Sequence, residues 1–174
     1  TSDTGNEDYF REDFNFQLEV QVPPVLFFAD RTGFLIDYKN TSIVDVKENQ
    51  FLINESFNGF DGGNLLGLGI NLVWDRRDNV FYPTEGHYQY IKFIVYPEPS
   101  DFIFSSFELD VRHYKKLLRN QVLATNLYMK TVSGNAPFYE LPALGGKNRM
   151  RGYFQGRFRD RNYVAFQSEF RQYF

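Results

Sequence analysis

The sequence predicts an all-β fold, an antiparallel up-and-down meander that forms part of a transmembrane β-barrel. Three observations lead to this prediction. Apolar and polar residues alternate in about seven segments, aromatic residues make up 19% of the 174 residues, and short turns alternate with long connections. Because successive side chains of a strand point to opposite faces, alternation with a period of two indicates strands rather than helices.

Composition narrows the class of protein further. The net charge of −3 at pH 7 provides no basic field for nucleic acid, so nucleic acid is not an expected partner. The absence of cysteine removes disulfides and thiolate metal sites. No apolar run approaches the roughly 18 residues that a transmembrane helix needs. The first residues do not resemble a signal peptide. We therefore expect that a signal peptide has been cleaved off or that the sequence is an excised piece.

The alternation is clearest from Asp13 to Val22, where one face of the expected strand is apolar and the other polar. A shorter strand is expected from Gly33 to Lys39. Five further strands are expected to begin near Leu66, Tyr88, Ile103, Leu123 and Val164. Many of the seven are close to the 9 to 11 residues that cross a bilayer at a tilt.

The connections between these strands are of two kinds. Tight turns are expected near Asp75 to Gly86 and Leu117 to Asn120, and long segments from Val46 to Leu65 and from Ser133 to Asn162. If the strands pair in chain order, both tight turns lie at one end and both long segments at the other. Transmembrane barrels have short periplasmic turns and longer outer loops, so this asymmetry favours a barrel.

A soluble β-sandwich is the main alternative, because it also alternates apolar and polar residues. The polar face of a sandwich meets bulk water and is mostly charged or rich in threonine. Here charged residues stand among tyrosines, asparagines and glycines, a mixture typical of a wet lumen. They are Glu108, Asp110, Arg112, Lys130, Glu169 and Arg171. No arginine or lysine lies in the middle of the expected lipid-facing rows, where it would cost about 2 to 4 kcal/mol.

Two motifs carry the most specific signal. The segment from Pro137 to Arg171 contains Phe138–Tyr139, Gly145–Gly146 and the tetrad Met150-Arg151-Gly152-Tyr153. The earlier segment DRRDNVFYPTEG contains Asp75, Arg77, Asp78, Pro83, Thr84 and Gly86. Together the two motifs resemble the signature of the BamA/TamA family of bacterial outer-membrane surface antigens, and the resemblance extends roughly from Gly33 to the end of the chain.

The resemblance implies a sixteen-stranded barrel, of which residues 1–174 are a partial domain with a long loop at 133–162. It also implies that this loop folds back into the lumen, where Arg151 docks against the barrel wall with Glu169 as the expected partner. A guanidinium stranded in the lumen would cost roughly 3 to 5 kcal/mol. Gly152 would allow close backbone approach, and Tyr153 would pack while keeping a polar tip. The alternative for Arg151 is an exposed arginine of an ordinary basic loop.

As a function, the resemblance implies assistance in the insertion or export of outer-membrane proteins, without enzymatic activity. The implied partners are outer-membrane lipid, client outer-membrane proteins and periplasmic repeats. A pore for small solutes and a barrel that anchors an attached enzyme domain are the alternative functions. Because rows such as Phe14, Phe16 and Leu18 would be exposed in water, the isolated chain is expected to self-associate.

Several residues resemble chemical sites, but other interpretations are preferred. Asp75, Asp78 and Glu85 could suggest calcium ligands, yet Arg76 and Arg77 lie among them and indicate neutralised turn charges. The two histidines, at positions 87 and 113, fit neither a zinc spacing nor a catalytic triad. The glycines at 67 and 69 fall inside a strand and are interpreted as small lumen-facing residues. No cofactor or metal is therefore expected.

Overall fold

A computed structural model describes residues 9–23, 27–46, 58–145, 156 and 158–172. Seven antiparallel strands form one sheet in chain order, which confirms the predicted meander. They are β1 (Tyr9–Val22), β2 (Arg31–Val46), β3 (Gly63–Asp75), β4 (Gly86–Tyr96), β5 (Phe104–Leu118), β6 (Gln121–Gly134) and β7 (Asn162–Gln172). The short 3-10 helix η1 (Phe138–Glu140) lies between β6 and β7. None of the helical structure in the described ranges is long and apolar enough to cross a membrane.

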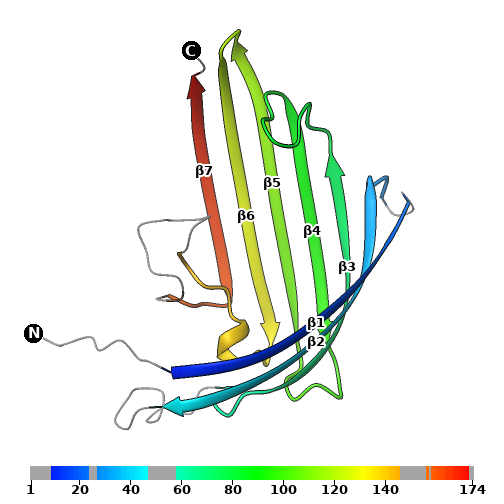
Figure 1. The fold of residues 1–174 in the computed structure, drawn as a ribbon, viewed down its shortest axis with the longest axis vertical. Helices are drawn as coiled ribbons and strands as arrows, with labels where there is room; N and C mark the ends of the chain where they lie inside the picture. The colour runs from blue at the N-terminus through cyan, green and yellow to red at the C-terminus, as the bar shows by residue number, and fades with distance from the viewer. Residues whose placement is uncertain (1–8, 24–26, 47–57, 146–155, 157, 173–174) are drawn as a thin grey trace, which may run out of the picture.

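The sheet is strongly curved. Strands β4 to β7 run beside one another, whereas β1 and β2 sweep across the lower part of the view in front of them (Figure 1). Curvature of this kind gives the sheet a concave and a convex face. A single curved sheet differs from the two packed sheets of a sandwich, so the sandwich alternative is wrong for the described residues.

Both predicted tight turns lie at one end of the sheet and both predicted long segments at the other, where the short β4–β5 connection at 97–103 also lies. The β3–β4 and β5–β6 connections lie at the upper end in Figure 1, and the long β2–β3 and β6–β7 connections leave and rejoin the sheet at the lower end. The β5–β6 hairpin turns through Arg119 and Asn120 alone. We call the upper end the turn end and the lower end the loop end.

The two faces of the sheet differ in chemistry. The convex face exposes the predicted apolar rows, for example Phe14 at 62% and Phe166 at 67% of their surface. The concave face carries the tyrosines, amides and charged groups of the alternate positions, such as Tyr128, whose hydroxyl donates to Glu108 at 2.9 Å. Such a division fits a barrel wall with lipid outside and water inside.

Strand β2 is longer than the predicted segment from Gly33 to Lys39, because it continues to Val46. Polar residues at 40–42 interrupt the apolar alternation there, which hides the strand in the sequence. In the structure these side chains bond across strands instead. Thr41 donates to Asp13 of β1 at 2.9 Å, and Asn40 donates to Asn64 of β3 at 2.7 Å.

Candidate functional site

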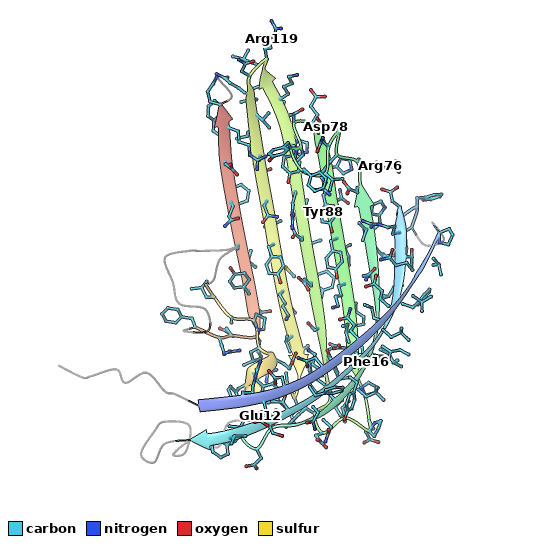
Figure 2. The ribbon with its side chains drawn as sticks, viewed as in Figure 1. Glu12, Phe16, Arg76, Asp78, Tyr88 and Arg119 are labelled. Atoms are coloured by element: carbon cyan, nitrogen blue, oxygen red, sulfur yellow. The ribbon has the colours of Figure 1, made fainter. Side chains whose placement is uncertain are left out.

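The β3–β4 turn, residues 76–85, brings the first predicted motif together. Arg77 makes a two-pronged ion pair with Asp75, with Nε to Oδ1 at 2.7 Å and Nη2 to Oδ2 at 2.6 Å. Its guanidinium also lies 4.8 Å from the centre of the Tyr88 ring. Figure 2 shows Tyr88 at the base of this turn, with Asp78 and Arg76 above it. The hydrogen bonds that Arg77 donates to Asp75 raise the pKa of Arg77, so this cation is held firmly at the end of β3.

Asp78 closes the turn by accepting three hydrogen bonds. The Thr84 hydroxyl donates to Oδ2 at 2.6 Å, and the backbone N–H groups of Thr84 and Glu85 donate to Oδ1 at 2.9 Å and 3.1 Å. Because these bonds favour the ionised carboxylate, and the Thr84 hydroxyl most of all, they lower the pKa of Asp78 to about 2. Asp78 thus acts as a structural acceptor within the turn.

Pro83 and Gly86 complete the motif with backbone roles. Pro83 is buried beneath the turn. Gly86 begins β4 with a φ of +101°, and a Cβ atom there would lie 2.0 Å from the Arg76 carbonyl oxygen. All six predicted positions of the motif are therefore parts of one compact turn. The position of Gly86 admits only glycine without strain.

Arg77 neutralises Asp75, as the sequence predicts for the turn charges, whereas Arg76 pairs with Asp30 at 3.0 Å. The Asp75 carboxylate is bound by Arg77, and that of Asp78 by donors of the turn itself. Across the described ranges, no group of three or more His, Asp or Glu side chains is arranged to hold a metal ion. Asn79 also marks this turn in the sequence. Its Oδ1 accepts from the N–H groups of Phe81 and Tyr82 at 2.8 Å and 3.0 Å, a pattern typical of asparagine at a turn.

The base of the long β6–β7 loop forms the second candidate region. Here Ala136 and Tyr139 are buried in an apolar cluster on the concave face. The strand residues of this cluster are Leu35, Leu65, Ile94, Tyr96, Phe104 and Val132. The rings of Tyr96 and Phe104 stack with their centres 4.4 Å apart. The start of the long loop therefore packs against the inner wall of the sheet.

An ion pair anchors the loop base beside this cluster. Lys39 of β2 contacts Glu140 at 2.8 Å and Asp37 at 3.6 Å, and all three side chains are largely buried. The Tyr96 hydroxyl donates to Asp37 at 2.6 Å. The sequence analysis did not single out Lys39 or Glu140, since no local pattern links residues so far apart in the chain.

Beyond η1 the two arms of the loop run antiparallel to each other. Leu144 donates its N–H to the Phe158 carbonyl at 2.9 Å, and Gly156 donates to the Leu144 carbonyl at 3.1 Å. Arg159 Nη1 donates to the Tyr139 carbonyl at 3.4 Å, which ties the returning arm to η1. The arms lead to the loop tip. Gly146 and the tetrad Met150, Arg151, Gly152 and Tyr153 belong to that tip and lie outside the described residues.

Glu169, the expected partner of Arg151, lies on β7 opposite Ala124 of β6. Its carboxylate is paired with Arg171, with Nε to Oε1 at 3.1 Å, and the Glu169 side chain is 63% exposed. Other charges of the inner wall are paired in the same way, since Arg112 contacts Asp110 at 2.7 Å. The wall thus presents acidic groups already linked to neighbouring cations.

Comparisons with known proteins agree with this geometry. The sequence profile of the Omp85 superfamily domain matches residues 1–173. Among solved structures, the chain is similar to BamA from Haemophilus ducreyi lacking POTRA domains 1-3, with a TM-score of 0.68 and 16% sequence identity. The similarity covers 85% of this chain and 31% of the BamA chain, so this chain spans about a third of that protein's length. A search of curated protein sequences returned no match.

Proposed function

Because the chain belongs to the Omp85 superfamily of bacterial outer-membrane β-barrel proteins, we propose that it forms part of a barrel that assists the insertion or export of other outer-membrane proteins. The observation that carries the proposal is the docking of the long-loop base on the concave face. An ordinary solute pore needs an open lumen, whereas here a loop is fixed against the inner wall by the Lys39–Glu140 pair and by buried Tyr139. In this proposal the barrel guides client strands and has no catalytic role.

The loop base supports a position of the loop tip inside the barrel. Tyr139 and Glu140 hold the outgoing arm to the concave face, and Arg159 bonds the returning arm to Tyr139. Because both arms are fixed at that wall, we expect the ten-residue segment 146–155 to extend into the lumen. The guanidinium of Arg151, in the tetrad Met150-Arg151-Gly152-Tyr153, would then face the inner wall.

Glu169 is the proposed acceptor for that guanidinium. A carboxylate has about four lone-pair sites, so Glu169 can accept from Arg171 and from a second arginine together. Its 63% exposure leaves room for such an approach. An arginine that enters a narrow lumen needs this pairing, because a stranded charge costs roughly 3 to 5 kcal/mol.

Arg151→Ala in the full-length protein tests the proposal. We expect slower assembly of client outer-membrane proteins, measured by the mobility difference between folded and heat-unfolded clients on gels. Arg149→Ala is the matched control, since it removes a neighbouring charge of the same loop and should leave assembly near the parental rate. Normal client assembly with Arg151→Ala would remove the proposal.

A charge exchange tests the partner. Glu169→Arg and Arg151→Glu should each impair client assembly. If the two side chains meet, the double variant that carries both substitutions should recover part of the loss. If the double variant loses as much as the two single variants combined, Glu169 is not the acceptor.

The proposed partners follow from the same function. Client strands and periplasmic repeats are expected to act together with the complete, sixteen-stranded barrel, of which these seven strands are a part. Without lipid, the exposed rows of β1 and β7 would meet water, so the isolated chain should self-associate. Sedimentation of residues 1–174 without detergent checks this, and a single monomeric species would contradict it.

A further inference from the structure

A pocket lies on the concave face beside the base of the long loop. Three lysines from three strands line it, Lys39 of β2, Lys92 of β4 and Lys130 of β6. Strand β1 contributes Gln17 and the 3-10 helix η1 contributes Glu140, so the sheet and the loop base together bound the pocket. Its volume is about 90 Å³, whereas a water molecule needs about 10 to 15 Å³. The pocket therefore has room for a small polyatomic ion.

The carboxylates on the loop side of the pocket already have partners. Lys39 contacts Glu140 at 2.8 Å and Asp37 at 3.6 Å. Asp37 also accepts a hydrogen bond from the Tyr96 hydroxyl at 2.6 Å. These two carboxylates and one ammonium group form a closed network with a net charge of −1, and this network anchors the loop base.

The other two lysines of the pocket lack such partners. Lys92 and Lys130 lie on either side of Glu108 of β5, in one row across three neighbouring strands (Figure 1). The Glu108 carboxylate accepts from the Tyr128 hydroxyl at 2.9 Å. Among the described residues, the side chain of neither lysine has an ion pair or a hydrogen bond. With two ammonium groups and one carboxylate, this side of the pocket has a net charge of +1.

The two ammonium groups are placed to hold an anion between them. Neighbouring strands lie about 4.7 to 4.9 Å apart, so about 10 Å separates the backbones of Lys92 and Lys130 across β5. Each lysine has a flexible four-carbon stem, and two such stems can converge on one group within this span. Both side chains are partly buried, and a charge withdrawn from water is unfavourable without a partner. The pocket as a whole is neutral, but the carboxylates of its loop side are already bound by Lys39.

We propose that Lys92 and Lys130 bind a small oxyanion of the phosphate class in this pocket. Ammonium groups attract a phosphate as point charges and donate to its oxygens. The Ser106 hydroxyl and the Gln17 amide line the same pocket, and neither has a hydrogen-bond partner in the described part of the chain, so both can donate as well. The bound anion would neutralise the positive side of the pocket. This site goes beyond the proposed function, because it requires neither a client nor the loop tip.

The test uses the full-length protein in detergent micelles, with the ionic strength held constant by sodium chloride. Equilibrium dialysis against radiolabelled inorganic phosphate measures binding. We expect one saturable site that Lys92→Gln and Lys130→Gln each weaken about tenfold, a loss typical of a hydrogen bond to a charged group. Lys116→Gln is the matched control, since it removes an exposed lysine of β5 outside the pocket and should leave binding unchanged. Gel mobility with and without heating verifies that each variant is folded.

Acetylation of lysines locates the site in the parent protein. A water-soluble N-hydroxysuccinimide ester labels the amines, and peptide mass spectrometry measures the rate at each position. Phosphate at about ten times its dissociation constant should slow the labelling of Lys92 and Lys130 about tenfold, because only the unoccupied protein reacts. The labelling rate of Lys116 should not change.

Three results would overturn the proposal. The first is the absence of saturable phosphate binding, or its persistence at full strength in Lys92→Gln and Lys130→Gln. The second is an equal slowing of labelling at Lys116, or by sodium chloride alone, which would show only general screening of charge. The third is protection of the two pocket lysines by a tetraglutamate peptide but not by phosphate, which would assign the pocket to an acidic polypeptide.

Discussion

The β3–β4 turn and the base of the long loop are both ordered, but different kinds of contact hold them. In the turn, Asp78 bonds Thr84 and Glu85, which follow within a few residues. In the loop base, Lys39 and Glu140 are 101 positions apart in the chain. The turn is a local structure that its own sequence specifies, whereas the loop base exists only when strands and loop have assembled. Four substitutions or conditions test this difference.

The largest effect is expected for Tyr139→Ala. Loss of a buried aromatic ring from the cluster with Leu35 and Ile94 should lower the free energy of unfolding by about 3 to 5 kcal/mol. Urea unfolding of the full-length protein in vesicles measures it. The β3–β4 turn should keep its structure, as judged by the Thr84 amide resonance. A shift of that resonance would show that the two regions are coupled.

Gly86→Ala should have the next largest effect, on the turn alone. Alanine at a φ of +101° is strained, and its Cβ would meet the Arg76 carbonyl oxygen at 2.0 Å. We expect a loss of about 2 kcal/mol in the free energy of unfolding. Gly156→Ala also replaces a glycine with positive φ, but its Cβ would meet only the end of the Arg159 side chain at 3.3 Å, so it serves as the milder control. Equal losses for both would contradict the steric argument.

Tyr139→Phe should instead stabilise the protein. Burial raises the pKa of Tyr139 to about 12, so its hydroxyl is neutral near pH 7. That hydroxyl is buried and has no hydrogen-bond partner among the described residues. Phenylalanine keeps the ring packing and removes the unsatisfied group, which should raise the free energy of unfolding by about 1 kcal/mol. A destabilised variant would mean that the hydroxyl has a partner.

Acid should loosen the β3–β4 turn locally. The pKa of Asp78 is lowered from 3.8 to about 2, so its ionised form stabilises the turn above pH 3.8 and this contribution is lost as the pH falls towards 2. Because Asp78 is exposed, the effect is small and local. The Thr84 amide resonance should move across this range in the parent protein and stay still in Asp78→Asn. A parent resonance that does not move would contradict the assignment.

Sequence patterns predicted the structural features that depend on residues close together in the chain. The alternation of Phe14 and Phe16 with polar residues predicted the outward rows, and the motif from Asp75 to Gly86 predicted a turn. The second half of β2 was missed, because Asn40 and Thr41 form cross-strand bonds that no local pattern reveals.

The family resemblance implied that the long loop folds back into the lumen, but it did not predict the contacts of the loop base. Burial of Tyr139 and pairing of Glu140 require the register of β2 with β3 and β4, which depends on the folded sheet. The tetrad around Arg151 and its contact with Glu169 remain predictions. Asn79 shows the opposite case, since its side chain bonds residues just ahead of it and its place in a turn could be recognised from the sequence.

The Tyr96 side chain has a mechanical consequence for the wall. It starts on β4, passes over Gly67 of β3, where a Cβ would lie 2.6 Å from its ring, and donates to Asp37 of β2 at 2.6 Å. Because Gly67 of β3 has no side chain, the Tyr96 ring can cross β3 and link β4 to β2. Under sideways tension, separating β3 from either neighbour would also require breaking this cross-link. We therefore expect β2, β3 and β4 to stay paired as one unit. If two neighbouring strands of the barrel separate, they should do so outside these three.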